Sequence, residues 1–189
     1  APPGVTGVDG PTRLDPPGGF DIDDEGVPAV SVTLVDSGNI CGRLCDRSAA
    51  AELGGSPGRG RRAAWDVVPV PRLSNLVVSP GETSPDDLES GLDRALVVTR
   101  LAGATVDPSS RRLVLRVERG WELRNGRRRR PLAPFELTGD CVDVLSHIDP
   151  SFGDDPTPDW RLGWCVKRGI ALPTGSEAPT LVVRRLEVL

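Results

Sequence analysis

Short runs in which apolar and polar residues alternate recur along the chain, and they constrain its fold more than any other sequence feature. Alternation covers residues 30–34 and 113–117, and residues 180–188 provide a further apolar segment. A period of two is typical of a half-buried strand. Asn125-Gly126 and the Asp36–Asn39 segment provide turn residues for hairpins. We therefore predict an α+β, sheet-dominated fold, with an antiparallel β-sheet or barrel-like core and two or three short helices.

Helical signals are short. Asp46 can cap a helix over residues 47–53, and a third short helix is predicted over residues 142–148. The clearest signal starts at Ser84, a good N-cap that precedes Pro85. The apolar residues that follow at helical spacing are Leu88, Leu92, Ala95 and Leu96. They predict a helix that packs on the sheet along one stripe.

The organisation along the chain suggests one main domain. Residues 1–20 are dense in proline and glycine, which predicts an irregular lead-in. Residues 21–189 show no repeat and no linker, which predicts a single domain. Within it, residues 54–62 predict a flexible basic loop. The chain has no methionine, from which we expect a processed or excised part of a longer polypeptide.

Charge and hydropathy argue against two classes of partner. The formal net charge of −4 disfavours nucleic acid or an anionic membrane as the main partner. No run of 18 or more apolar residues occurs, so no membrane-spanning helix is predicted. Arg127–Arg130 forms a basic run without interleaved aromatic residues, and we interpret it as a charge block on an edge strand.

The four cysteines are Cys41, Cys45, Cys141 and Cys165. A chain of this length can build its own core, so free thiols are expected more than two disulfides. Cys41, Cys45 and Cys141 together with His147 offer the alternative of a structural Cys₃His zinc site. Their spacing is poor for such a site, and we interpret His147 as a residue at the end of a helix.

Six motifs in the same order resemble the C-terminal region of the TldD/PmbA family over essentially the whole chain. They are Asp23-Asp24-Glu25-Gly26-Val27-Pro28, the hairpin LVDSGNICGRLCDR, Gly60-Arg61-Arg62, Pro71-Arg72-Leu73-Ser74-Asn75, Pro80-Gly81-Glu82, and Gly163-Trp164-Cys165-Val166-Lys167-Arg168-Gly169 with Pro173-Thr174-Gly175. Each motif is weak by itself, and the order makes the resemblance specific. The chain departs from the family pattern at Val166, where the family usually has glycine, and at Glu177.

The resemblance implies a zinc peptidase of which this chain holds one component. In TldD-like enzymes a helix with His-Glu-x-x-x-His and the cysteine of the Gly-x-Cys run hold the metal. Two imidazoles and a thiolate leave one tetrahedral position for water. This chain has one histidine and no His-Glu pair, so the catalytic residues must lie outside it, or it is a ligand-deficient relative. By resemblance, Cys165 is the metal ligand, with a buried structural thiol as the alternative.

Five further residues are candidates for substrate binding. Lys167 is the only lysine and could stabilise a peptide carboxylate or a developing oxyanion. Arg61 and Arg62 could bind a peptide terminus, and Asp24 and Glu25 could support the site. A solvated side chain is the alternative for each of the five.

If Cys165 is a ligand, we expect it on an irregular loop near the surface, close to Lys167, Asp24 or Glu25. The three other cysteines are expected to be packed in the fold.

The function implied by the resemblance is the C-terminal half of a zinc metallopeptidase that cleaves unfolded or small peptides. Its cofactor would be zinc. Its partners would be an N-terminal half that carries HExxxH, an identical or TldE/PmbA-like subunit in a dimer, and a peptide bound by strand addition. We expect a cytoplasmic protein without nucleic-acid or membrane partners, and an isolated chain without peptidase activity.

Two alternatives remain open. The first is a non-catalytic scaffold or pairing subunit of a TldD/TldE-like heterodimer. Cys165 and Lys167 favour the peptidase, because the non-catalytic branch generally ends without the Cys-Lys run. The second alternative is a stand-alone protein that tailors a peptide natural product.

Overall fold

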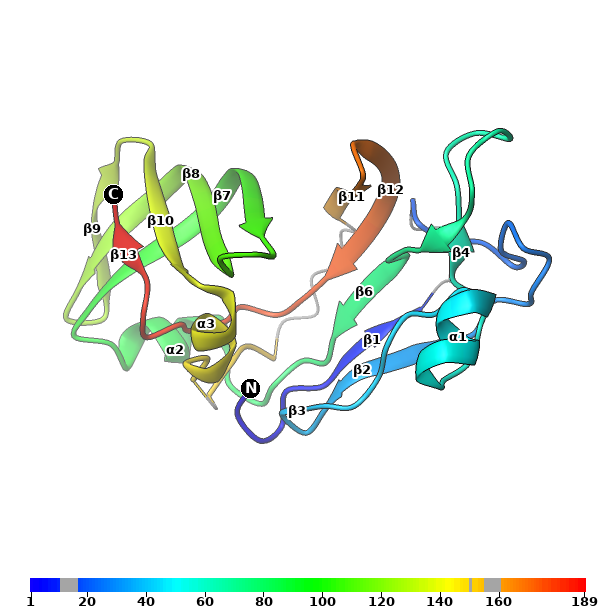
Figure 1. The fold of residues 1–189 in the computed structure, drawn as a ribbon. Helices are drawn as coiled ribbons and strands as arrows, with labels where there is room; N and C mark the ends of the chain where they lie inside the picture. The colour runs from blue at the N-terminus through cyan, green and yellow to red at the C-terminus, as the bar shows by residue number, and fades with distance from the viewer. Residues whose placement is uncertain (11–16, 150, 155–160) are drawn as a thin grey trace. The chain divides into compact units, whose positions relative to one another are not determined.

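The fold is α+β and sheet-dominated, as the alternating pattern predicts, and its sheets are open (Figure 1). The computed structural model describes residues 1–10, 17–149, 151–154 and 161–189. The chain divides into two compact units. The "hairpin unit" comprises Gly4–Ser79 and Pro156–Pro179, and the "ribbon unit" comprises Ala1–Pro3, Pro80–Asp155 and Thr180–Leu189. Segments from the start, middle and end of the chain form the ribbon unit, whereas the sequence predicts one domain over residues 21–189.

The hairpin unit is built on a six-stranded sheet. Its strands are β1 (Gly7–Asp9), β2 (Val32–Asp36), β3 (Asn39–Ile40), β6 (Asn75–Val78), β11 (Arg161–Lys167) and β12 (Ile170–Glu177). The spatial order is β11-β12-β6-β1-β2-β3, and each neighbouring pair is antiparallel except β12 and β6. A separate two-stranded ribbon joins β4 (Gly60–Arg61) to β5 (Val70–Pro71).

Strand β1 lies inside this sheet, although the sequence predicts an irregular lead-in over residues 1–20. It pairs with β2 on one side and with β6 on the other. The prediction was wrong for Gly7–Asp9 because their hydrogen-bonding partners lie far along the chain. A three-residue strand leaves no periodic pattern of its own, and only the neighbouring strands define it.

The ribbon unit is a five-stranded sheet whose largest feature is a long antiparallel pair. Its strands are β7 (Arg94–Asp107), β8 (Arg112–Arg124), β9 (Arg127–Leu132), β10 (Phe135–Asp140) and β13 (Glu187–Val188). Asn125 and Gly126 form the turn between β8 and β9 with φ of 49° and 67°, which confirms the predicted hairpin. The basic run falls on β9, which pairs with β8 alone among the described strands, as the edge-strand interpretation predicts.

The helices are short, and two of them lie close to their predicted ranges. α1 spans Arg47–Leu53, and the Asp46 side chain accepts a hydrogen bond from the Ala49 amide. α3 spans Cys141–Ser146 and has His147 as its C-cap, as expected. No helix of the described residues is long and apolar enough to cross a membrane.

The helix that follows Ser84 is shorter than predicted. α2 begins after Ser84 and spans Pro85–Ser90, with Leu88 buried. Leu96 lies on β7 and is 41% exposed, so the predicted stripe does not continue. Pairing of β7 with β8 determines the conformation of these residues, and this tertiary pairing overrides their helical spacing.

Candidate functional site

Cys165 and Lys167 lie on a β-hairpin, whereas an irregular loop was predicted for Cys165 as a metal ligand. β11 and β12 pair in continuous register from Arg161 opposite Ser176 to Lys167 opposite Ile170. Arg168 and Gly169 connect them with φ of 53° and 76°, the positive values of a two-residue hairpin turn. The prediction was wrong because Gly163 and Gly169 resemble loop residues, whereas pairing with β12 makes the segment a strand.

The two faces of this hairpin differ. Cys165 is half-buried and lies opposite Leu172, which is 8% exposed. Leu162, Trp164 and Val166 are 61%, 61% and 65% exposed. Alternate residues of a strand point to opposite faces, so the thiol shares the inward face while three apolar side chains share the outward face. β11 is also the last strand in the sheet order, with an outer edge that no other described strand pairs.

Arg72 holds the closed end of the hairpin. Its side chain is 2% exposed, and Nη1 donates hydrogen bonds of 2.8 Å to both the Cys165 and the Ile170 carbonyl oxygens. Nη2 donates a 3.2 Å bond to the Lys167 carbonyl oxygen. The Lys167 ammonium donates to the Pro71 carbonyl oxygen at 3.2 Å. Arg72, which directly follows β5, therefore attaches to the backbone carbonyl oxygens of the hairpin.

Arg61 lies near the Cys165 side chain. Its Nη1 donates a 2.9 Å hydrogen bond to the Leu73 carbonyl oxygen, and the guanidinium lies 5.0 Å from the centre of the Phe20 ring. Burial lowers the pKa of Arg61, and the neighbouring Asp24 carboxyl and Cys165 thiol act in the opposite direction. Arg61 is thus close enough to Cys165 for an electrostatic interaction, and Lys167 lies two residues beyond Cys165 on β11.

The three acidic residues Asp23–Glu25 accept hydrogen bonds from backbone amides of neighbouring segments. Asp24 accepts a 2.7 Å bond from the Arg62 amide, and its other oxygen lies 3.9 Å from the Arg62 Nε. Glu25 accepts a 2.8 Å bond from the Arg47 amide in the first turn of α1. Asp23, which is buried, accepts bonds from three amides, including that of Gly60 at 2.9 Å. These carboxylates hold the backbone at β4, which contains Arg61, and at the start of α1.

A buried polar network lies at the centre of the hairpin unit. Asp9 is fully buried and accepts hydrogen bonds from the Ser74 amide at 2.9 Å, the Ser74 hydroxyl and the Asn75 amide at 3.1 Å. Arg59 is fully buried too, with its Nη1 3.7 Å from the Asp9 carboxylate and its Nη2 bonded to the Asp9 carbonyl oxygen at 2.8 Å. Burial lowers the pKa of Arg59, and Asp9 opposes that shift.

The buried network and the role of Arg72 were not predicted from the sequence. Residues 54–62 were predicted to be a flexible basic loop, yet Arg59 is among the most buried large side chains described. The available signal was the Pro71–Asn75 motif, whose Arg72, Ser74 and Asn75 are all buried. The residues of this motif hold the buried network together, and no such role was predicted for them from the sequence.

The described residues do not form a complete metal site. They contain no group of three or more His, Cys, Asp or Glu side chains that could hold a metal ion. All four cysteines are free, and Cys45 is buried as expected. Cys41 is exposed and Cys141 is half-buried, so the expectation that all three are packed was wrong for Cys41. The Cys165 thiol has the chemistry of a soft metal ligand, and any further ligands would have to come from outside the described residues.

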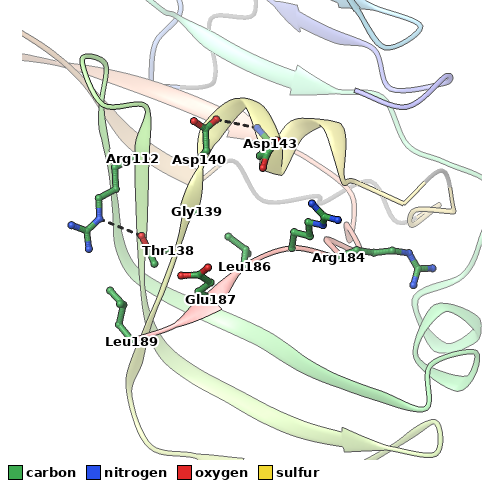
Figure 2. Close-up of a pocket in the computed structure, with 10 residues that line it drawn as sticks. Arg112, Thr138, Gly139, Asp140, Asp143, Arg184, Leu186, Glu187 and Leu189 are labelled. Atoms are coloured by element: carbon green, nitrogen blue, oxygen red, sulfur yellow. Dashed lines mark hydrogen bonds between the residues drawn. The ribbon is translucent and has the colours of Figure 1, made fainter.

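The ribbon unit has an open cavity of about 710 Å³ around the end of β10, α3 and β13 (Figure 2). Arg112 donates to the Thr138 hydroxyl at 3.4 Å across its rim, and Asp140 caps α3 by accepting from the Asp143 amide at 3.1 Å. Arg184 is paired with Asp149. The cavity contains none of the residues singled out from the sequence, and these polar groups already have partners.

Comparisons with known proteins agree on one family. A family model described as PmbA/TldA metallopeptidase C-terminal domain matches residues 1–189. A metalloprotease TldD homolog from Haemophilus influenzae is 29% identical over 187 residues, which is 98% of this chain and 39% of that protein. A metalloprotease from Methanothermobacter thermautotrophicus is 30% identical over 98% of this chain and 40% of its own length. The chain therefore spans about two fifths of the curated relatives that it matches.

Solved structures show the same fold. A Thermotoga maritima protein described as a candidate modulator of a DNA gyrase has a TM-score of 0.76 and 25% identity, covering 100% of this chain and 40% of that chain. TldE from Thermococcus kodakarensis has a TM-score of 0.74 and 18% identity, covering 97% of this chain and 39% of that chain. At 18% identity the second similarity shows the fold alone.

Proposed function

The chain belongs to the PmbA/TldD metallopeptidase family as a C-terminal domain, and on this premise we propose that it supplies one thiolate zinc ligand, Cys165, to a peptidase acting on unfolded or small peptides. The remaining ligands and the catalytic residues would come from a segment with His-Glu-x-x-x-His outside this chain. The relatives named metalloproteases support a metal-dependent activity. Zinc is our proposal, because two imidazoles and a thiolate form one of its catalytic ligand sets.

The position of Cys165 is the observation that carries this proposal. The thiol is half-buried on a strand whose closed end is held by Arg72, and it lies near Arg61. A ligand on a strand is held more precisely than one on a loop, which suits a metal site. When bound, zinc would polarise a peptide carbonyl and generate a hydroxide nucleophile near neutral pH.

The outer edge of β11 supports a role in holding an extended peptide. Its backbone is unpaired by any other described strand, and Trp164 and Val166 beside it are exposed. A peptide could add to this edge as a further strand, which would recognise backbone with little regard for sequence. Unfolded or small peptides are the substrates that can take up such an extended conformation.

Lys167 is the strongest of the five substrate-binding candidates. Its side chain is exposed, and its ammonium uses one described hydrogen bond, to the Pro71 carbonyl oxygen. An ammonium has three donors, so donors remain for a peptide carboxylate. Arg61, Asp24 and Glu25 bond to the protein's own backbone, and for them a supporting role is the better proposal. Arg62 also donates to a backbone carbonyl, that of Trp65.

The experiment compares Cys165→Ala with Cys41→Ala in the full-length protein and its partner subunit. Cys41 is an exposed cysteine of the same unit and provides the matched control. We expect Cys165→Ala to lower zinc occupancy and cleavage of an unstructured peptide together, while Cys41→Ala changes neither. Unchanged zinc content and cleavage in Cys165→Ala would rule out the ligand role.

A second candidate is a non-catalytic pairing subunit of a TldD/TldE-like heterodimer. The fold similarity to TldE is compatible with it, since the fold alone does not separate the two branches. The zinc content of the unmutated full-length protein distinguishes the two candidates. A full-length protein that binds no zinc with Cys165 intact, yet is needed for the activity of a partner, would favour the pairing subunit.

A further inference from the structure

We propose that Arg72 is a positioning residue for the Cys165 ligand, which it holds through the backbone of the β11–β12 hairpin. This inference rests on the proposed function of Cys165. The Arg72 side chain does not need to contact the metal or the substrate in this role. It would fix the strand from which the thiol projects.

The hydrogen bonds of Arg72 are concentrated at the position of the candidate ligand. Its three described side-chain bonds all end on carbonyl oxygens of one hairpin, including that of Cys165 itself at 2.8 Å. The acceptors lie 93 to 98 residues from Arg72 in the chain, so the contact ties two distant segments together. Since a hairpin at the end of a sheet is held by neighbours on one side only, an added anchor at its closed end limits its movement.

The anchor is itself attached to the buried network. The Arg72 amide donates a 3.0 Å hydrogen bond to the Arg59 carbonyl oxygen, and Arg59 is paired with the buried Asp9. Ser74, two residues after Arg72, bonds to the Asp9 carboxylate through its amide. Directional bonds therefore run from the centre of the sheet to the backbone of Cys165.

The energetics of Arg72 favour a positioning role over a purely stabilising one. No described carboxylate forms an ion pair with its guanidinium, whereas Arg59 is paired with Asp9. The Nε of each arginine is buried without a partner among the described residues. Burying an unpaired donor on a cation costs free energy that an apolar side chain would avoid. A locally unfavourable choice of this kind is typical of sites where geometry matters for function.

Lysine could not replace this geometry. The planar guanidinium reaches three carbonyl oxygens from two nitrogens, whereas an ammonium is a compact group on a flexible stem. Arg72→Lys therefore keeps the charge and removes the fork. Arg59→Lys is the matched control, because it makes the same substitution at a buried arginine whose side chain has no described bond to the hairpin. It also keeps the Arg59 backbone carbonyl to which the Arg72 amide donates.

The test uses full-length protein with zinc or cobalt as the metal. We expect Arg72→Lys to lower zinc affinity roughly 10- to 100-fold, the range measured when groups that orient a metal ligand are removed. The thiolate-to-metal charge-transfer band of the cobalt form should weaken. In the metal-free protein, a neutral alkylating reagent should modify Cys165 roughly tenfold faster, while Cys41 reacts at an unchanged rate. Arg59→Lys should leave the cobalt band in place, even where it lowers the melting temperature.

The outcomes separate this inference from the proposed function. If Cys165→Ala lowers zinc affinity but Arg72→Lys changes neither affinity, cobalt band nor alkylation rate, the positioning role is wrong and the ligand role stands. If Arg72→Lys and Arg59→Lys weaken the cobalt band equally, the effect is a general loss of stability, which also overturns the positioning role. If Cys165→Ala leaves zinc affinity unchanged, the proposed function fails and this inference fails with it.

Discussion

The two units of the molecule are stabilised in different ways. In the hairpin unit the buried centre is polar, with Asp9, Arg59, Ser74 and Asn75 fully buried and joined by hydrogen bonds. In the ribbon unit the buried side chains of the sheet are mainly apolar, although Thr138 is buried too, and the charged pairs lie at the surface. These apolar residues are Val117, Leu123 and Leu137. The surface pairs include Arg128 with Glu89 and Arg130 with Glu122.

The two kinds of interior differ in how precisely they fix the positions of side chains, more than in how much they stabilise the fold. Apolar burial is non-directional and tolerates small shifts, whereas a satisfied buried network fixes the relative positions of its members. The candidate ligand Cys165 belongs to the unit with the directional network, and the fork of Arg72 extends those bonds to its backbone. The comparison suggests that the hairpin unit is arranged to hold a site in place. The following variants test it, beginning with the largest expected effect.

Asp9→Ala should be the most destabilising change, at about 3–5 kcal/mol, because it leaves the Arg59 cation buried without its partner. Hydrogen exchange should lose protection in β1 and β6, while β8 and β10 keep theirs. Asp36→Ala, at an exposed aspartate of the same sheet, is the control. Equal loss of protection in both units would show that they do not unfold separately.

Leu123→Ala tests the apolar counterpart in the ribbon unit. Leu123 is fully buried on β8, and we expect a loss of about 3 kcal/mol from lost burial and the cavity left behind. Protection against exchange should now fall in β8 and β10 and persist in β1. Leu123→Met keeps most of the volume and should cost less than about 1.5 kcal/mol. If Leu123→Met were as harmful as alanine, the ribbon unit would be no more tolerant than the polar one.

Asp46→Ala examines a polar contact of the hairpin unit that lies outside the buried network. Its carboxylate accepts a 2.7 Å bond from the Ala49 amide at the start of α1. Removal should cost about 1 kcal/mol, the usual effect of a lost N-cap, with faster exchange at Ala49. Asp46→Asn keeps an acceptor and should restore most of the stability. A loss of stability as large as that of Asp9→Ala would mean that the buried network contributes no more than an ordinary helix cap.

Glu122→Gln should have the smallest effect and depends on pH. Hydrogen bonds from Arg130 and Arg124 lower the pKa of Glu122 to about 2. A carboxyl with a lowered folded pKa adds stability above its unfolded pKa of about 4.5, and this stability is lost as the pH falls toward 2. The melting temperature of the wild type should therefore fall slightly more than that of Glu122→Gln across this range. High salt should reduce the difference, since the pair is at the surface.

Local structure was readable from the sequence wherever the determining residues are neighbours. The Asn125-Gly126 turn and the Asp46 cap were predicted correctly because each depends on groups within a few residues. Of the candidate site, the sequence identified Cys165 and Lys167 as a pair and placed them in a family motif. The single histidine also established that this chain cannot complete a two-histidine metal site by itself.

The remaining features were decided by contacts between distant segments. Arg59 resembles a loop residue in a run of glycine and arginine, and its burial depends on Asp9, 50 residues away. Cys165 lies on a strand because β12 pairs with it, and Arg72 reaches its carbonyl oxygen across 93 residues. The sequence by itself thus determined which segments alternate, turn and cap, since propensity and capping act over a few residues. Only the tertiary structure decided which polar groups are buried, because a buried charge is tolerated only where folding brings its partner to it.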